Sequence, residues 1–261
     1  MNKFILNYLG LFFILLSVLS FFNIVYSYYF NLYLNINTYF YTFLISIIIG
    51  LISFFYKSFD SKITIYQKIF AVFIGYILLP IVIAIPFYLS IYNVSFLDCY
   101  FEATSGFTST GFTIFDNIKH IDESLILWRS TSQWIGGIYF LFSILLLIDI
   151  FDNSLRKSLT NFINFNYSEI FKQFFKILIL YTALTFLIFI ILKLINLRTF
   201  DSFNLAMTII SSGGFLPVNN IDSIINTNLK EIGMSFLMLF SFFSLYLIYN
   251  IIFLKDKSLN F

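Results

Sequence analysis

Two short segments rich in hydroxyl side chains and glycine occupy similar positions in the two halves of this chain. The first runs from Phe96 to Thr113 and the second from Thr199 to Phe215. With a shift of 102 residues their hydroxyl and glycine positions coincide, in the pairs Ser109–Ser211, Thr110–Ser212 and Gly111–Gly213. Each segment starts with a stretch typical of a short helix, so the repeated unit predicts a short helix followed by a tight loop.

Loops of this composition could bind a dehydrated monovalent cation. A cation such as potassium that crosses a membrane must exchange its water shell for oxygens at similar distances, and inward-pointing backbone carbonyls supply them. Glycine permits the backbone geometry, and a helix C-terminus facing the same point adds partial negative charge. The predicted ion-binding residues are Thr108, Ser109, Thr110, Gly111, Ile210, Ser211, Ser212 and Gly213. Two ordinary polar loops on the outer surface remain the alternative that composition and spacing leave open.

Other kinds of chemistry have little support in the sequence. His120 is the only histidine and Cys99 the only cysteine, so no Cys/His metal cluster and no intrachain disulfide is expected. No nucleophile–base pair or carboxylate dyad stands out, which argues against an enzyme, and no cofactor is predicted. The net charge of +2 is too small to indicate a nucleic-acid partner.

The composition indicates a membrane protein. Hydrophobic residues make up 60% of the chain and charged residues 11%, whereas soluble domains average about 25% charged residues. We therefore predict an all-α integral membrane protein in contact with lipid, with six transmembrane helices and the two loops as re-entrant pore segments. The predicted spanning helices cover about 4–30, 38–56, 69–97, 125–148, 170–195 and 232–254.

The basic residues predict the orientation, because cytoplasmic loops carry an excess of Lys and Arg. One set of loops holds Lys3, Lys57, Lys62, Lys68, Arg156, Lys157, Lys172, Lys176, Lys255 and Lys257. The opposite set holds Lys119, Arg129, Lys193, Arg198 and Lys230. Both termini are therefore predicted to be cytoplasmic, with the two loop segments facing outside. The predicted units are an N-terminal helix pair at 1–60 and two helix–pore–helix repeats at 61–155 and 156–261.

Single polar residues in these segments allow narrower predictions. Glu102 either attracts cations or has a structural role as a buried acid bonded to backbone amides, and the structural role is favoured. Asp98 and Asp201 are predicted to N-cap the short helices. Arg129 is predicted to be an interfacial anchor, and Gly136–Gly137 to allow close helix packing.

Beyond these patterns, the sequence resembles a known family. Phe101–Thr113, followed by Leu127–Gly137, resembles the first pore repeat of the TrkH/KtrB potassium-uptake family, within the Trk/Ktr/HKT superfamily. Ser211–Phe215 resembles the family's second repeat, and Ala84–Tyr88 the segment before its first loop. The N-terminal helix pair matches an extra pair in the family, so the resemblance covers essentially the whole chain.

The resemblance implies a function and partners. It implies potassium uptake across the bacterial plasma membrane by a pore-forming subunit, regulated by a cytoplasmic TrkA/KtrA-like nucleotide-binding protein. The family has four repeats around one pore, whereas two are recognised here, so a second chain is expected to complete it. That chain would be another copy or a second-half protein. A truncated, non-conducting remnant of such a transporter is the alternative, and a membrane enzyme or assembly factor is a third.

Overall fold

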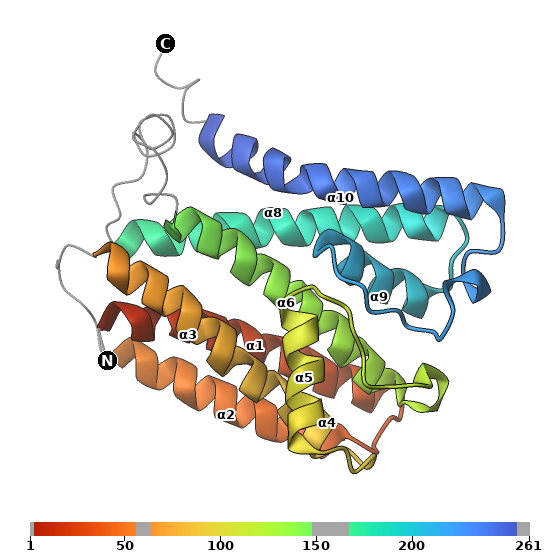
Figure 1. Cartoon of the computed structure of the whole chain (residues 1–261), viewed down its shortest axis with the longest axis horizontal. Helices are drawn as coiled ribbons and strands as arrows, with labels where there is room; N and C mark the ends of the chain where they lie inside the picture. The colour runs from red at the N-terminus through yellow and green to blue at the C-terminus, as the bar shows by residue number, and fades with distance from the viewer. Residues whose placement is uncertain (1–2, 56–63, 148–166, 255–261) are drawn as a thin grey trace.

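The computed structural model describes residues 3–55, 64–147 and 167–254, and within these ranges the chain forms helices and loops but no strand (Figure 1). In these ranges six long helices run across the fold, and short helices connect some of them. The long helices are α1 (Lys3–Tyr29), α2 (Ile36–Phe55), α3 (Ile65–Ile83), α6 (Glu123–Leu147), α8 (Tyr167–Leu194) and α10 (Asn228–Leu254). The short helices are α4 (Ile85–Tyr88), α5 (Phe96–Phe107) and α9 (Thr199–Ile210).

Four segments among the described residues are long and apolar enough to span a membrane. They are Phe4–Tyr29, Ile36–Ser53, Ile65–Tyr88 and Phe174–Leu194. The helices α6 and α10, with 25 and 27 residues, occupy the remaining two predicted spans. The protein is thus a multi-pass, all-helical membrane protein over the part described, while the count of six spans stays a prediction.

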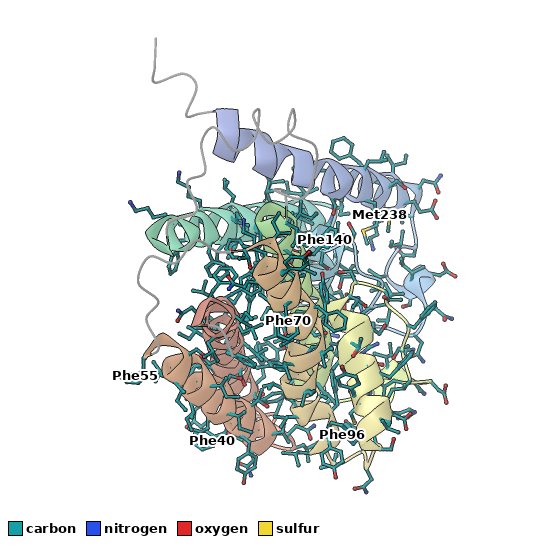
Figure 2. The ribbon with its side chains drawn as sticks, turned by 60° about the vertical axis from the view of Figure 1, so that its left-hand side comes forward. Phe40, Phe55, Phe70, Phe96, Phe140 and Met238 are labelled. Atoms are coloured by element: carbon teal, nitrogen blue, oxygen red, sulfur yellow. The ribbon has the colours of Figure 1, made fainter. Side chains whose placement is uncertain are left out.

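The outer surface is apolar, as a lipid-facing surface must be. Large hydrophobic side chains point outward from most of the helices (Figure 2), including Phe40, Phe55, Phe70, Phe96, Phe140 and Met238. Lipid can cover such side chains without the cost that water would impose. This exposure agrees with the low share of charged residues in the sequence.

The predicted third helix is wrong at its C-terminal end. The prediction placed one helix over about 69–97, but α3 ends at Ile83, α4 ends at Tyr88, and α5 begins at Phe96. Pro86 lies in the first turn of α4, where its missing N–H costs no helical hydrogen bond. Asn93 then adopts a positive φ of 50°, which reverses the chain before α5. The link carries no charged residue, so hydropathy alone could not separate these elements.

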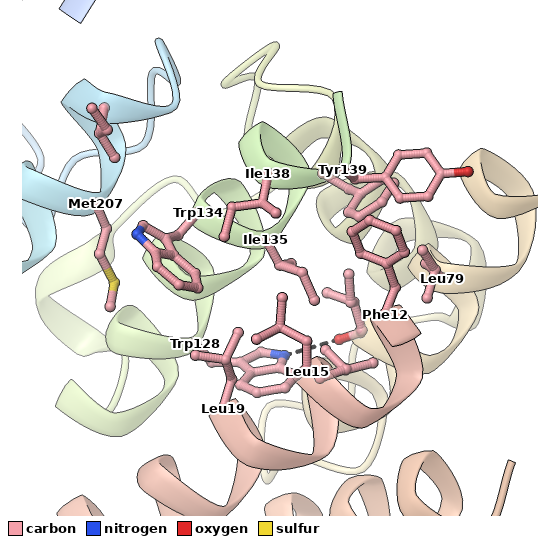
Figure 3. Close-up of a cluster of buried hydrophobic side chains, with 14 of the residues drawn as sticks. Phe12, Leu15, Leu19, Leu79, Trp128, Trp134, Ile135, Ile138, Tyr139 and Met207 are labelled. Atoms are coloured by element: carbon pink, nitrogen blue, oxygen red, sulfur yellow. Dashed lines mark hydrogen bonds between the residues drawn. The ribbon is translucent and has the colours of Figure 1, made fainter. Parts of the chain in front are cut away.

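Helix α6 lies at the centre of the fold. It contacts α1, α3, α5, α8 and α9, and its side chains dominate the buried cluster in Figure 3. The Trp128 Nε1 donates to the Ile83 carbonyl oxygen at 3.0 Å, and the Tyr139 hydroxyl donates to the Val72 carbonyl oxygen at 2.8 Å. These bonds satisfy the polar ends of two large buried rings and fix α6 against α3.

The order of elements repeats along the chain. A long helix, a short helix, a glycine-containing loop and a second long helix occur as α3–α5–α6 and again as α8–α9–α10. The predicted unit boundaries near residues 60 and 155 lie outside the described residues, so the division into three units stays a prediction.

Candidate functional site: two glycine loops held by one helix

The two short helices start differently. In α5 the N-cap is Ser95, whose Oγ accepts from the Asp98 backbone N–H at 3.2 Å and donates to the Asp98 carboxylate at 2.7 Å. The α9 helix has Arg198 at its N-cap position, without a side-chain cap. The prediction that Asp98 and Asp201 are N-caps is therefore wrong, and both lie in the first turn instead. Burial raises the pKa of the Asp201 carboxyl above its ordinary value, while nearby Arg198 opposes that rise.

The first loop leaves α5 through a left-handed turn. The Ser109 φ is 56°, and its N–H donates to the Gly106 carbonyl oxygen at 3.0 Å. The Thr110 N–H then donates to the Ser105 carbonyl oxygen at 2.9 Å. This is the Schellman pattern of a helix C-terminus, with serine in place of the usual glycine.

The second loop leaves α9 with the same geometry. The Ser212 φ is 53°, and its N–H donates to the Ile209 carbonyl oxygen at 3.0 Å. The Gly213 N–H donates to the Thr208 carbonyl oxygen at 2.8 Å. The two loops therefore leave their helices through the same turn, and they differ at the next residue, where Gly111 has a positive φ and Gly214 does not.

The structural offset between the copies is 103 residues, so the predicted offset of 102 is wrong by one. The equivalent pairs are Ser109–Ser212, Thr110–Gly213 and Gly111–Gly214. The same offset relates Asn93 to Asn196, which both have a positive φ before their short helices. The Gly213–Gly214 doublet explains the error, because either glycine can be matched to Gly111 in the sequence.

The two loops meet at a pair of glycines. The Gly111 φ is +81°, and a Cβ at Gly111 would lie 2.6 Å from the Gly214 Cα. A Cβ at Gly214 would lie 3.2 Å from the Gly111 Cα. Side chains at these positions would force the loops apart, so both need glycine for close approach, and the positive φ of Gly111 also favours glycine there.

A buried ion pair braces the first loop. Glu102 in α5 is 0% exposed and Arg129 in α6 is 1% exposed, and the Arg129 Nε donates to the Glu102 Oε1 at 2.7 Å. The same carboxylate accepts from the Thr113 hydroxyl at 3.0 Å and from the Ile114 N–H at 2.9 Å. The structural role predicted for Glu102 is confirmed. The prediction that Arg129 is an interfacial anchor is wrong, because its head group lies inside the protein.

Arg129 also reaches the second loop. Its Nη1 donates to the Leu216 carbonyl oxygen at 3.3 Å, and its guanidinium lies 4.3 Å from the centre of the Phe215 ring. Its Nη2 donates to the Thr113 hydroxyl at 3.0 Å in the first loop. One buried guanidinium therefore connects both loops.

Gln133 braces the second loop from the same helix. Its side chain is 0% exposed. In the amide orientation that matches donors with acceptors, its oxygen accepts from the Gly214 and Phe215 N–H groups at 2.9 and 3.1 Å, and its nitrogen donates to the Thr208 hydroxyl at 3.1 Å. A Cβ at Gly213 would overlap the Gln133 side chain. Arg129 and Gln133 are four residues apart and so share one face of α6.

The glycine pair in α6 allows the loops to come this close. A Cβ at Gly136 would overlap the Phe107 carbonyl group at the end of α5, and one at Gly137 would lie 3.0 Å from the Ser211 Cβ after α9. The predicted packing role of Gly136–Gly137 is confirmed.

A cavity of about 410 Å³ lies at the C-terminal ends of α5 and α9. Of the eight predicted ion-binding residues, those that line it are Thr108, Ser109, Ile210, Ser211 and Ser212. Thr110, Gly111 and Gly213 belong to the loops but do not line the cavity. Within the described part of the chain, the carbonyl oxygens of Ser109, Thr110, Gly111, Ser212, Gly213 and Gly214 accept no hydrogen bond. Helix C-termini and free carbonyls favour a cation and disfavour an anion.

Sequence reasoning missed Arg129 and Gln133 as supports for the loops, although one signal was available. A charged residue and an amide spaced i, i+4 inside an otherwise apolar helix indicate an interior polar face. Its partners, which lie in two separate loops, could not be identified from the sequence.

These features define a multi-pass membrane protein with two glycine loops at the ends of paired short helices. The sequence is 32% identical over 164 residues to a cation transporter of Methanocaldococcus jannaschii that is described as uncharacterized, covering 58% of this chain and 33% of that protein. It is 34% identical over 64 residues to the potassium-uptake protein TrkG of Escherichia coli, covering 24% of this chain and 13% of that protein. No family model matches the chain.

The fold of this chain matches a solved structure over most of the length of this chain. The crystal structure of the potassium transporter TrkH from Vibrio parahaemolyticus superposes with a TM-score of 0.73 and 18% identity, covering 91% of this chain and 49% of TrkH. The chain is therefore similar in sequence to Trk potassium-uptake proteins and shares the fold of TrkH, and it spans about half the length of TrkH. Its relatives are transporters rather than enzymes.

Proposed function

We propose that this chain forms part of a potassium-uptake pore in the plasma membrane, and that its two loops supply two sides of the ion filter. The observation that carries the proposal is the contact between two related loops at Gly111 and Gly214, beside a cavity at the C-terminal ends of α5 and α9. The family relationship supports the choice of potassium as the transported ion.

The proposed ion ligands are the backbone carbonyls of Thr108–Gly111 in the first loop and Ile210–Gly213 in the second. The structural offset of 103 adds Gly214, the partner of Gly111, to the second set. Carbonyls in succession can replace part of the water shell of a potassium ion, and the helix C-termini lower the energy of a positive charge beside them.

The buried arginine does not oppose this role. Arg129 lies behind the loops, where a lone positive charge would repel a cation. The Glu102 carboxylate, 2.7 Å away, neutralises it, so the pair acts on the ion as a dipole instead of a net charge. The pair thus holds the loops without blocking the site electrostatically.

Two loops do not surround an ion, so the proposed pore needs further loops from outside these 261 residues. They would come from a second copy or from a second-half protein. We further propose six spans with re-entrant loops, both termini in the cytoplasm, and regulation by a TrkA/KtrA-like nucleotide-binding subunit. The excess of basic residues on the loops predicted to be cytoplasmic supports this orientation.

Growth at limiting potassium tests this function. An uptake-deficient bacterial strain would express the chain alone, or with the membrane proteins encoded beside it, and the amount of chain in the membrane fraction would be measured in each case. We expect growth to be restored when the complete set of pore loops is present. Failure of every combination, with the chain stably inserted, would contradict the proposal.

A further inference from the structure

A second cavity, of about 580 Å³, shares no lining residue with the cavity beside the two loops. Its walls come from α1, α6, α8 and α9, and they include Leu19, Trp134, Phe186 and Met207. Figure 3 shows Trp134 and Met207 on neighbouring helices with their side chains toward each other. The volume lies in the range of small-molecule sites, and the lining is almost entirely apolar.

The cavity is a crevice between α1 and α8. These helices approach each other near one end, where the Phe12 and Phe174 rings lie 5.4 Å apart. Tyr26 of α1 stacks on Phe200 at the start of α9, with 6.4 Å between ring centres. Residues of the rim are exposed, with Phe22 at 62% and Phe186 at 58%. Because α1 and α8 are both candidate membrane spans, the crevice is continuous with the lipid-facing surface.

A buried amide lines this apolar space. Asn23 is 1% exposed, and among the described residues neither its Oδ1 nor its Nδ2 has a hydrogen-bond partner. The hydroxyls of Thr131, Thr182 and Thr185 in the same wall donate to carbonyls of their own helices. Buried polar groups are nearly always paired, and water needs two to four polar partners to stay in such a space. A ligand with a long apolar chain and one hydrogen-bonding group therefore matches the lining of the crevice.

We propose that the crevice binds an acyl chain of a membrane phospholipid, with its ester carbonyl accepting a hydrogen bond from the Asn23 amide. The wall of α1 from Leu19 to Phe30 extends over roughly 16 Å, enough for an extended stretch of acyl chain. The bound chain lies against Met207 of α9 and Trp134 of α6. The lipid thereby packs against α9, the helix that leads into the second loop.

The two tryptophans of the chain provide the test, because only Trp134 lines the crevice. Trp128 is 1% exposed and is bonded to the Ile83 carbonyl oxygen on another face of α6 (Figure 3). The variants Trp128→Phe and Trp134→Phe each leave one reporter. Each would be reconstituted in nanodiscs of phosphatidylcholine whose acyl chains carry bromine, which quenches indole fluorescence on contact. The result does not depend on transport.

We expect brominated lipid to lower the Trp134 emission roughly twofold relative to unbrominated lipid, because the acyl chain comes within contact distance of the indole. The Trp128 emission should change little. Equal quenching of the two reporters, or no quenching of Trp134, would overturn the proposal.

Substitutions on α1 sharpen the test. Val25 lines the crevice and Val18 does not, and both are partly exposed, so Val25→Phe should reduce Trp134 quenching while the matched control Val18→Phe should not. Ether-linked lipids lack the ester carbonyl that would accept a hydrogen bond from Asn23. In nanodiscs made mostly of ether-linked lipid with a little brominated ester lipid, Asn23→Leu should therefore also reduce the quenching of Trp134. Unchanged quenching in both Val25→Phe and Asn23→Leu would contradict the assigned site.

Discussion

The two glycine loops begin with the same turn but differ in the side chains that hold them. The first is braced by a buried ion pair, Glu102 with Arg129, and the second by a neutral amide, Gln133. In the second copy, the position equivalent to Glu102 is Leu205, which is buried and apolar. The loop conformation is thus set locally, by serine and glycine at fixed positions, whereas the support comes from a single helix of the first repeat.

This difference in support makes the internal repeat asymmetric. Helix α6 places Arg129 and Gln133 on one face, so it supports its own loop and that of the second repeat. The corresponding helix of the second repeat, α10, contacts α9 through Ser241, whose Oγ donates to the Ile209 carbonyl oxygen. A substitution in α6 that removes contacts to both loops should therefore destabilise both. A substitution that removes the support of one loop should affect that loop more than the other.

The largest expected effect is from Arg129→Met. It leaves the Glu102 carboxylate buried without its partner, which costs about 3–5 kcal/mol in comparable cases. We expect a large fall in the thermal unfolding midpoint in detergent, with loss of uptake. The double variant Glu102→Gln with Arg129→Met should recover part of that stability, since no unpaired charge remains. Equal destabilisation by the single and double variants would contradict the ion-pair account.

A smaller effect is expected for Gln133→Leu. It leaves the Gly214 and Phe215 N–H groups without an acceptor, at about 1–3 kcal/mol for a buried group. Gln133→Met matches the length of the glutamine side chain without its acceptor oxygen, so it should destabilise the protein to a similar extent. Proteolysis or hydrogen exchange should show the second loop loosened more than the first. Equal loosening of both loops would show that Gln133 does not distinguish them.

The smallest effect is expected at the helix starts. Ser95→Ala removes the N-cap of α5 and should cost about 1 kcal/mol. The matched change Arg198→Ala in α9 removes no cap hydrogen bond, so it should cost less, apart from the exposed ion pair with Glu123. The unfolding midpoints of the two variants measure the difference. A larger loss for Arg198→Ala would reverse the comparison.

Much of the fold could be predicted from hydropathy. The helices α1, α2 and α8 agree with the predicted ranges, because long apolar runs there are bounded by polar or charged residues. The end of α3 was missed because the link from Tyr88 to Phe96 carries no charged residue, so the charge-free run continues through it. The absence of charge shows that a segment can lie in lipid, but it does not show where a helix ends, and an uncharged turn has the same signal as a helix.

The candidate site could be predicted only in part. The loops and their glycines were found because serine, threonine and glycine recur at matching positions. The offset of 102 instead of 103 followed from the Gly213–Gly214 doublet, which only the backbone conformation can resolve. Arg129 was misplaced because counting basic residues by loop assumes that each one faces water, whereas its partner Glu102 lies 27 residues earlier in another helix.

The potassium-to-sodium flux ratio of the assembled transporter in proteoliposomes tests the central claim most directly. We expect Gly111→Ala and Gly214→Ala each to lower this ratio, because an added Cβ separates loops that meet at these two residues. Gly233→Ala in α10 is the control, since its Cβ would have only ordinary contacts. A ratio that stays at the wild-type value in both loop variants, with the protein inserted and assembled, would contradict the claim that these two loops form part of the filter.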